Sequence, residues 1–303
     1  MYKRQWLWHA FALGDEFICN YRFKQPLFGG EQTHHGVMMT DGVTLNRGGE
    51  EFVQAMNEIR SIVPELTDQE AEYIKATKTG FLFSYRNLLD MDNHKHHEDW
   101  DSWQHIYTYY QGLKRLGVSV DFLQEDHNFD PSTHPFLVVP AYQLMSKELI
   151  QKLENYANAG GHVIISTRTG IKDPNGHLWE AKLQEPIWDL IGAEIRFYDH
   201  LPSQYPGEVA SFGKSYQWHV WGEVVSPKPD TQVLATYEDQ FYKGKAAVSQ
   251  RKITNGGSVT YVGVWSDDWE MEYEIVQRVY EDHVDEELFD LPPYVFIEHR
   301  EGV

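Results

Sequence analysis

A short Gly-rich stretch, GGEQTHHG at residues 29–36, gathers a carboxylate, an amide and two imidazoles. Glycines at both ends let such a turn present its polar side chains to a ligand. Glu31 and His34 stand three residues apart, and both types of side chain can hydrogen-bond adjacent hydroxyl groups of one ligand. Tyr21 precedes the turn and can supply an apolar face. The alternative that the residue types leave open is that Glu31 and His34 only stabilise the loop.

A second polar stretch, residues 92–101, contains five side chains of types that bind metals: His94, His96, His97, Glu98 and Asp99. Their spacing fits no well-defined ligand pattern. Acidic residues also favour the N-terminus of a helix, and a helix is expected directly after this stretch. We therefore expect a solvated loop, and we predict neither a metal site nor a cofactor.

The elements around the first stretch follow from its apolar pattern. Residues 4–13 are predicted to form the end of a buried helix, and Glu16–Phe23 a strand. A helix is expected at 46–63, because apolar residues recur there at helical spacing: Phe52, Met56, Ile59 and Val63. One strand, loop and helix cannot bury their own apolar surface. The unit therefore indicates the remainder of a larger sheet or barrel.

After a polar connector at 64–80, strands and helices alternate. We predict strands at 80–85, 118–123, 136–141 and 162–166, and helices at 101–116 and 146–159. The uninterrupted apolar run FLVVPA at 136–141 is typical of a buried parallel strand. This order predicts a doubly wound α/β layer.

Residues 207–265 favour β-structure, with strands expected at 232–237, 246–253 and 258–265 and a hairpin turn at 255–257. A helix is predicted at 270–283, and a further strand begins near 292. The α/β layer has no GxGxxG or GxxxxGK[ST] phosphate loop, no GxSxG elbow and no cysteine after Cys19. It is therefore interpreted as a scaffold or an interface.

The composition excludes several classes of partner. The formal net charge is -20, whereas nucleic acids and anionic membranes require basic patches. Cys19 is the single cysteine, which excludes an intrachain disulfide and a multi-cysteine zinc site. No apolar run reaches the roughly 18 residues of a membrane span. We expect neither a nucleic-acid partner nor a membrane partner.

The stretch YRFKQPLFGGEQTHHG at 21–36 resembles the eighth barrel strand and following loop of glycoside hydrolase family 42, the β-galactosidases. That family's segment typically reads Phe-Arg-Trp-Arg-Gln, then a short run ending in Glu-Gln-x-His. The chain has Tyr-Arg-Phe-Lys-Gln at 21–25 and Glu-Gln-Thr-His at 31–34, without a gap. Residues 9–18 and 237–265 are similar to the family as well. Lys24 replaces the usual arginine, and because lysine cannot form a bidentate fork, a barrel salt bridge there would be weaker.

The resemblance implies an α/β chain in which the C-terminal remnant of a (β/α)8 barrel is followed by a flavodoxin-like, glutamine-amidotransferase-like domain. The implied domains are 1–66 for the end of the TIM barrel, 67–287 for the trimerisation domain and 288–303 for the truncated start of a small β-domain. In the family, both catalytic carboxylates come from earlier barrel strands. The chain is therefore expected to be a fragment without catalytic residues, and inactive alone.

By the same resemblance, Glu31 and His34 match residues that hydrogen-bond galactose hydroxyls, and Tyr21 matches one that packs against the sugar. The implied activity of the parent enzyme is retaining hydrolysis of terminal β-D-galactose residues. The implied partners are a galactoside and two further copies in a homotrimer, and the implied compartment is the cytoplasm. Two alternatives stay open: a stand-alone, non-catalytic sugar-binding or assembly module, and a glutamine-amidotransferase-like enzyme, against which the missing cysteine speaks.

Overall fold

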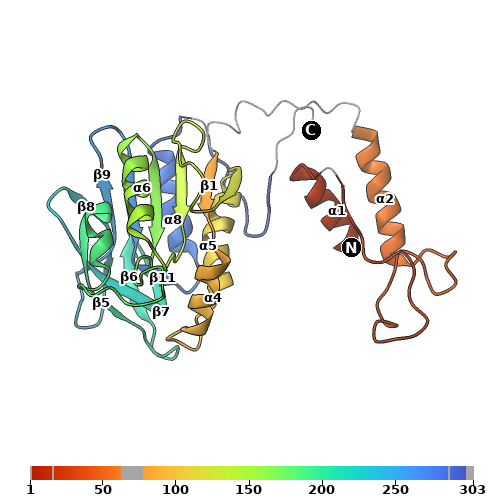
Figure 1. Ribbon diagram of the computed structural model, residues 1–303, viewed down its shortest axis with the longest axis horizontal. Coiled ribbons are helices and arrows are strands. Elements are labelled where there is room, and N and C mark those ends of the chain that lie inside the picture. Colours follow the sequence, from red (N-terminus) through yellow and green to blue (C-terminus); the bar gives the residue numbers. More distant parts are fainter. Residues whose placement is uncertain (1, 16, 63–77, 286, 298–303) are drawn as a thin grey trace. The chain divides into compact units, whose positions relative to one another are not determined.

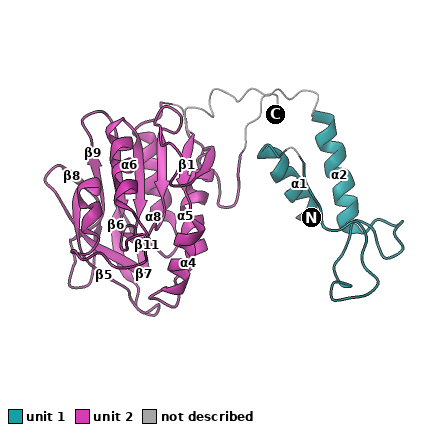
Figure 2. Ribbon diagram, in the orientation of Figure 1, with its two compact units in different colours: residues 1–72, 298–303 teal, residues 73–297 magenta. Residues whose placement is uncertain are grey.

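The computed structural model describes residues 2–15, 17–62, 78–285 and 287–297. The chain divides into two compact units (Figure 1, Figure 2): residues 1–72 with 298–303, and residues 73–297. Most of the connector predicted at 64–80 lies outside the described residues. Among the residues described, no helix is both long enough and apolar enough to cross a bilayer.

Unit 1 is built on two packed helices, α1 (Tyr2–Ala12) and α2 (Arg47–Ile62), so both predicted helices form. The burial predicted for the first is wrong, because Leu7 is the one buried side chain among those described in α1 and Trp6 is exposed. The contacts that join them are a small buried core of Leu7, Ala55 and Ile59 and hydrogen bonds from Arg4 and Trp8 to the carboxylate of Glu58. A long loop runs from α1 to α2 and carries the Gly-rich stretch. The two helices therefore form the base from which this loop extends.

The strand predicted at Glu16–Phe23 is wrong for residues 17–23, which are irregular. Apolar and aromatic residues favour a strand, but a strand also needs a neighbour that pairs with its backbone groups. In the described part of unit 1, such pairing is confined to the end of the segment, where Arg22 and Phe23 accept hydrogen bonds from Val37 and Met38 and Lys24 forms an isolated bridge with Met38. The apolar pattern of residues 17–23 suits a strand, but the described part of unit 1 contains no sheet with which this segment could pair.

Unit 2 contains a mixed β-sheet with a parallel part. Its strand order is β2 (Val120–Leu123), β1 (Thr79–Leu82), β3 (Phe136–Val139), β4 (His162–Ser166) and β10 (Ser258–Val262). Every residue of the last four strands is buried. The four strands predicted in this layer are confirmed as β1 to β4, and the continuous apolar run of β3 is typical of a parallel strand covered on both faces.

The antiparallel part continues from β10 through β9 (Ala246–Lys252), β8 (Thr231–Tyr237), β6 (Gly207–Ser211), β7 (Lys214–Pro227) and β11 (Val264–Ser266), and β5 (Ala193–Asp199) also pairs with β7. The three strands predicted after residue 231 are confirmed, with the last one divided into β10 and β11. The turn at 255–257 joins β9 and β10 as a hairpin. The individual strands β5, β6 and β7 were not predicted.

Helices cover both faces of the sheet (Figure 1). The first face carries α4 (Tyr85–Asn93), α5 (Ser102–Arg115) and α8 (Glu270–Glu281), and the second carries α6 (Lys147–Asn158), η2 (Glu185–Ile187) and α7 (Trp188–Ile191). Successive residues of β3 alternate between the two cores, with Phe136 and Val138 in the first and Leu137 and Val139 in the second. Helix α4 is capped by Ser84 and was not predicted, because it buries only Asn87, Leu88 and Met91.

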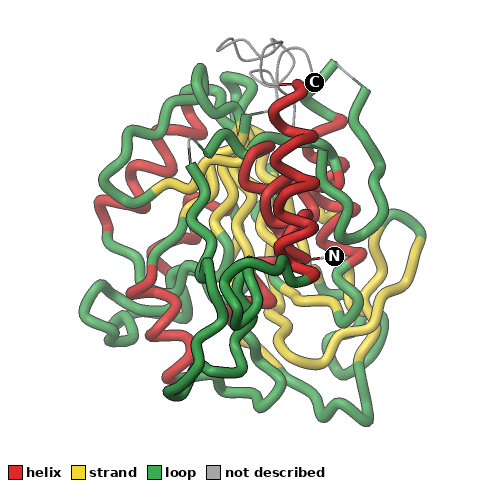
Figure 3. Tube along the Cα trace, turned by 90° about the vertical axis from the view of Figure 1, so that its right-hand side faces the viewer, coloured by secondary structure: helices red, strands yellow, loops and turns green. Residues whose placement is uncertain are grey.

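The segment at 287–297 lies along α5 in irregular conformation, so the strand expected near residue 292 is wrong for the described residues. The backbone N–H of Leu291 donates to the carbonyl of Arg115 at 3.0 Å. The rings of Tyr294 and Tyr107 stack with centroids 6.4 Å apart. These contacts attach the segment to unit 2. Figure 3 draws the loops of the chain in green, the strands in yellow and the helices in red.

A buried carboxyl in α8 predicts how stability depends on pH. Glu272 accepts hydrogen bonds from the backbone and hydroxyl of Ser266, and its burial raises its pKa to about 7 from 4.5. Between these values the folded state holds a proton at Glu272 that the unfolded state lacks, so the contribution of Glu272 to the free energy of unfolding should decline by about 3 kcal/mol as pH rises. Denaturant unfolding at each pH, with Glu272→Gln as the reference, separates this decline from the opposite contribution of buried histidines.

The matched control is Glu281→Gln, an exposed carboxyl at the end of the same helix. Glu272→Gln should remove the decline between pH 4.5 and 7 because no proton is taken up there. Glu281→Gln should keep it. A Glu272→Gln variant with the full decline would show that another group is responsible.

Candidate functional site

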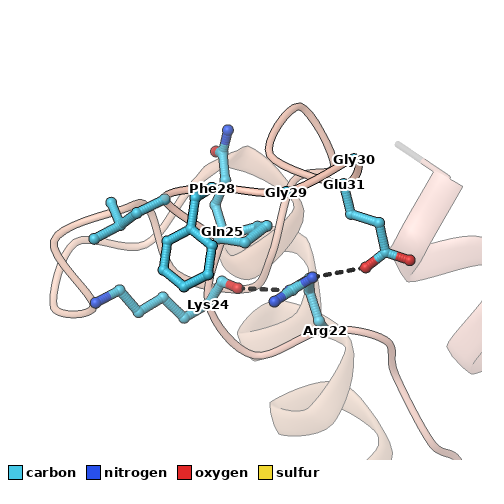
Figure 4. A pocket seen from close by; sticks show the side chains of 9 residues that line it. Arg22, Lys24, Gln25, Phe28, Gly29, Gly30 and Glu31 are labelled. Atoms are coloured by element: carbon cyan, nitrogen blue, oxygen red, sulfur yellow. Dashed lines mark hydrogen bonds and ion pairs between the residues drawn. The ribbon is translucent and has the colours of Figure 1, made fainter.

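The loop of unit 1 encloses an open hollow of about 560 Å³ (Figure 4). Its lining runs from Arg22 to Glu31 and includes Phe28 and the backbone of the two glycines at 29 and 30. A second hollow of about 470 Å³ lies on the same loop and shares Gln25, Pro26 and Leu27 with the first. Among the residues that line the two hollows, Glu31 is the only carboxylate.

Backbone pairing holds the lining segment in place. The N–H of Val37 donates to the carbonyl of Arg22 at 2.9 Å, and the N–H of Met38 donates to that of Phe23 at 2.7 Å. The two segments approach so closely that a Cβ atom at Gly36 would lie 2.7 Å from the carbonyl carbon of Lys24. Only glycine allows this approach, so the last glycine of the stretch acts as a packing site.

The N-terminus of α2 fixes the other end of the loop. Asn46 accepts a hydrogen bond from the backbone N–H of Gly49 at 3.1 Å, as an N-capping side chain does, and its amide group donates to the carbonyl of Gly36. Its own N–H donates to the carbonyl of Val37 at 3.1 Å. One buried side chain thus ties the start of the helix to the Gly-rich stretch.

The carboxylate of Glu31 is held by two neighbours on the opposite side of the loop. The hydroxyl of Tyr21 donates to Oε2 of Glu31, and Nη1 of Arg22 donates to the same oxygen at 2.9 Å. The hydrogen bond to Glu31 is the main reason why the pKa of Tyr21 is raised above its ordinary value. The structure therefore brings together Tyr21 and Glu31, two of the three residues singled out in the sequence.

His34 lies on the same turn, and its backbone N–H donates to the carbonyl of Glu31 at 2.8 Å. Its side chain is exposed and lines neither of the two hollows. The short turn therefore places His34 beside Glu31 in the chain without joining their side chains.

Arg22 is the residue of this site that the sequence analysis did not single out. In a regular strand at Glu16–Phe23, neighbouring side chains would point to opposite faces, which would turn Arg22 away from Tyr21. Because the segment is irregular, both side chains reach the same carboxylate. Arg22 belongs to the motif at 21–25 that resembles the family, and this position in the motif could have indicated it as a site residue.

The histidine-rich stretch after α4 lies against the end of the sheet in unit 2. The guanidinium of Arg168 stacks between Trp100 and Trp221, at 4.2 and 4.7 Å from the ring centroids. It donates to the backbone carbonyls of His94 and Lys95 at 2.8 and 3.1 Å. Within the described ranges, no three His, Cys, Asp or Glu side chains gather closely enough to hold a metal ion.

A serine and a histidine also meet at the carboxyl end of β4. The hydroxyl of Ser166 lies 2.8 Å from Nε2 of His105, and desolvation lowers the pKa of His105 to about 3. Both side chains are buried, so a substrate cannot reach the hydroxyl. This edge of the sheet is closed by packing, which agrees with its interpretation as scaffold.

Comparisons with known proteins bear on both units. The model of the β-galactosidase trimerisation domain matches residues 77–287, and that of the β-galactosidase family matches residues 2–62. A β-galactosidase of Haloferax lucentense is 28% identical over 268 residues, which cover 88% of this chain and 38% of the relative. A β-galactosidase of Halorubrum lacusprofundi is 27% identical, with 86% and 37% covered. The chain thus spans less than half the length of these relatives.

Solved structures agree in fold. The polyextremophilic β-galactosidase of Halorubrum lacusprofundi superposes with a TM-score of 0.87 at 26% identity, covering 98% of this chain and 42% of that one. A β-galactosidase from Bacillus circulans sp. alkalophilus has a TM-score of 0.84 at 16% identity, with 98% and 44% covered. The second likeness is one of fold alone. With family models matching in both units, the chain belongs to the β-galactosidases of glycoside hydrolase family 42.

Proposed function

We propose that this chain is part of a retaining β-galactosidase and supplies part of its galactose pocket and its oligomer interface. The observation that carries the proposal is the carboxylate of Glu31, fixed by Tyr21 and Arg22 in an open hollow. Charged acceptors held in this way suit neutral ligands rich in hydroxyl groups. The names of the relatives support galactosides as the substrate class.

In this proposal Glu31 and His34 bind the sugar, Tyr21 packs against it, and none of them cleaves it. A retaining glycosidase needs two carboxyl groups about 5–5.5 Å apart, one as nucleophile and one as acid and base. The lining of the two hollows offers one carboxylate. With Glu31 assigned to sugar binding, both catalytic groups are proposed to come from other parts of the parent enzyme, and the purified chain alone should leave a nitrophenyl galactoside intact.

We propose the domain division 1–66, 67–287 and 288–303, with the first as the end of a (β/α)8 barrel and the last as the start of a small β-domain. The second is proposed to be flavodoxin-like. Its parallel strand order, β2-β1-β3-β4-β10, is the order 2-1-3-4-5 of that fold. The cytoplasm stays the proposed compartment on the family resemblance alone.

A homotrimer through residues 67–287 is the proposed assembly, and an exposed aromatic surface supports it. Tyr85, Trp103 and Phe122 each contact the ring of Phe83, with centroids 4.9, 5.9 and 6.1 Å away. All three are more than half exposed. Because like-charged copies of an acidic chain repel one another, contacts between them favour apolar surface of this kind.

The roles of Glu31 and His34 can be tested in a hybrid enzyme, in which residues 17–46 of this chain replace the aligned segment of the Haloferax lucentense relative. Charge-assisted hydrogen bonds contribute about 1.5–3 kcal/mol each, so Glu31→Gln should lower kcat/KM by about 10²-fold or more. His34→Ala should cost less, because a neutral imidazole forms a weaker bond. A variant of the enzyme's nucleophile provides the scale of complete loss.

Two results would contradict this assignment. If Glu31→Gln is as inactive as the nucleophile variant and azide restores turnover with inverted configuration, Glu31 is the nucleophile. If its kinetics equal those of the unmodified hybrid, the loop is only structural.

Self-association is tested by sedimentation equilibrium of residues 67–287 produced alone. We expect a cooperative melt and the mass of three protomers. Trp103→Asp should lower that mass, because it places a charge in the aromatic surface, whereas Phe241→Asp, at another exposed ring, should not. A folded monomer at every concentration would reject the assembly, and a trimer unaffected by Trp103→Asp would exclude this surface as its interface.

A further inference from the structure

We infer that Arg22 is a positioning residue: it fixes one oxygen of Glu31 so that the other oxygen faces the hydroxyls of a β-galactoside. The part that concerns the sugar rests on the proposed function. The part that concerns Arg22 and Glu31 rests on the geometry of the loop alone.

The guanidinium is itself anchored before it meets the carboxylate. Nε of Arg22 donates to the backbone carbonyl of Lys24 at 2.8 Å, while Nη1 donates to Oε2 of Glu31 at 2.9 Å (Figure 4). Nη1 also lies 3.0 Å from the hydroxyl oxygen of Tyr21. A planar guanidinium can donate hydrogen bonds to the backbone carbonyl and to the carboxylate at the same time. The single ammonium group of a lysine cannot make both bonds in this geometry.

These bonds divide the two oxygens of Glu31 between protein and solvent. Oε2 receives two donors, the hydroxyl of Tyr21 and Nη1 of Arg22, which is the usual capacity of one carboxylate oxygen. Oε1 receives no hydrogen bond from the described residues that surround it. It therefore keeps both lone pairs for ligand hydroxyls, and two adjacent hydroxyls of a sugar match this capacity.

The exposure of the pair explains why positioning is needed. The side chain of Glu31 is 51% exposed, whereas that of Arg22 is 26% exposed. A half-exposed glutamate samples several rotamers unless a partner holds it, and a ligand would have to restrict that motion on binding. Arg22 reduces the conformational entropy that Glu31 would lose on binding a ligand, because the guanidinium is itself held by the backbone carbonyl of Lys24.

The first test needs no ligand and follows the ionisation of Tyr21 in the full chain by ¹³C NMR of labelled tyrosine, assigned with Tyr21→Phe. The hydrogen bond to Glu31 raises the pKa of Tyr21, whereas the charge of Arg22 lowers it. If Arg22 positions Glu31, Arg22→Ala releases the carboxylate and the pKa of Tyr21 falls toward its ordinary value. If Arg22 supplies only charge, the pKa rises, which would overturn the inference. The matched control is Arg47→Ala, an exposed arginine of α2 that should change nothing.

The second test measures binding of isopropyl β-D-thiogalactoside to the full chain by saturation-transfer NMR. Arg22→Ala should weaken binding about tenfold, and Arg22→Lys should not restore it. Adding Glu31→Gln to Arg22→Ala should cost little more, while adding His34→Ala should cost its full separate factor. Additive losses for Arg22 and Glu31 would overturn the inference. No binding by the unmodified chain would reject the sugar part of the inference. The hybrid enzyme decides the proposed function, and the Tyr21 titration decides whether Arg22 positions Glu31.

Discussion

The ion pair between Arg22 and Glu31 is the interaction on which the candidate site depends, because it orients the one carboxylate that lines the two hollows of the loop. Its two atoms lie 2.9 Å apart, and the arginine is fixed in turn by the backbone of Lys24. That backbone is held by the close approach of Gly36, which the capping residue Asn46 ties to α2. A chain of short-range contacts thus leads from a packed helix pair to one exposed oxygen. In the proposed function this restraint favours binding, since an acceptor that is already oriented loses less entropy when it binds a hydroxyl.

Unit 2 uses similar resources for a different purpose. The carboxyl edge of its parallel strands is where sheets of this kind bind ligands, yet here buried side chains close it. Arg168 lies between two tryptophans and donates hydrogen bonds to backbone carbonyls of the histidine-rich stretch. The hydrogen-bonded pair of Ser166 and His105 is buried at the same edge. The polar groups at this edge serve packing, whereas the aromatic surface around Phe83 is exposed and is the surface proposed to mediate self-association.

The sequence predicted the parts of the fold that local patterns determine. Helices with a periodic apolar face, such as α2 and α5, and the fully buried strands β3 and β4 are examples. Helix α4 was not predicted because it buries few residues. The strand predicted at Glu16–Phe23 was wrong because strand formation depends on a neighbouring strand that no local pattern reveals. The same error hid Arg22, since alternation along a strand would have turned it away from Tyr21. The motif at 31–34 identified Glu31, but its partners required the three-dimensional arrangement.

The central claim is that Glu31 binds the sugar and does not attack it. A 2-deoxy-2-fluoro-β-D-galactoside with a good leaving group tests this directly, because it traps the covalent glycosyl-enzyme intermediate of a retaining enzyme. The hybrid enzyme that carries residues 17–46 is labelled, digested and analysed by peptide mass spectrometry. The account predicts that the label is attached to a carboxylate outside the grafted segment. A label on Glu31 would contradict it.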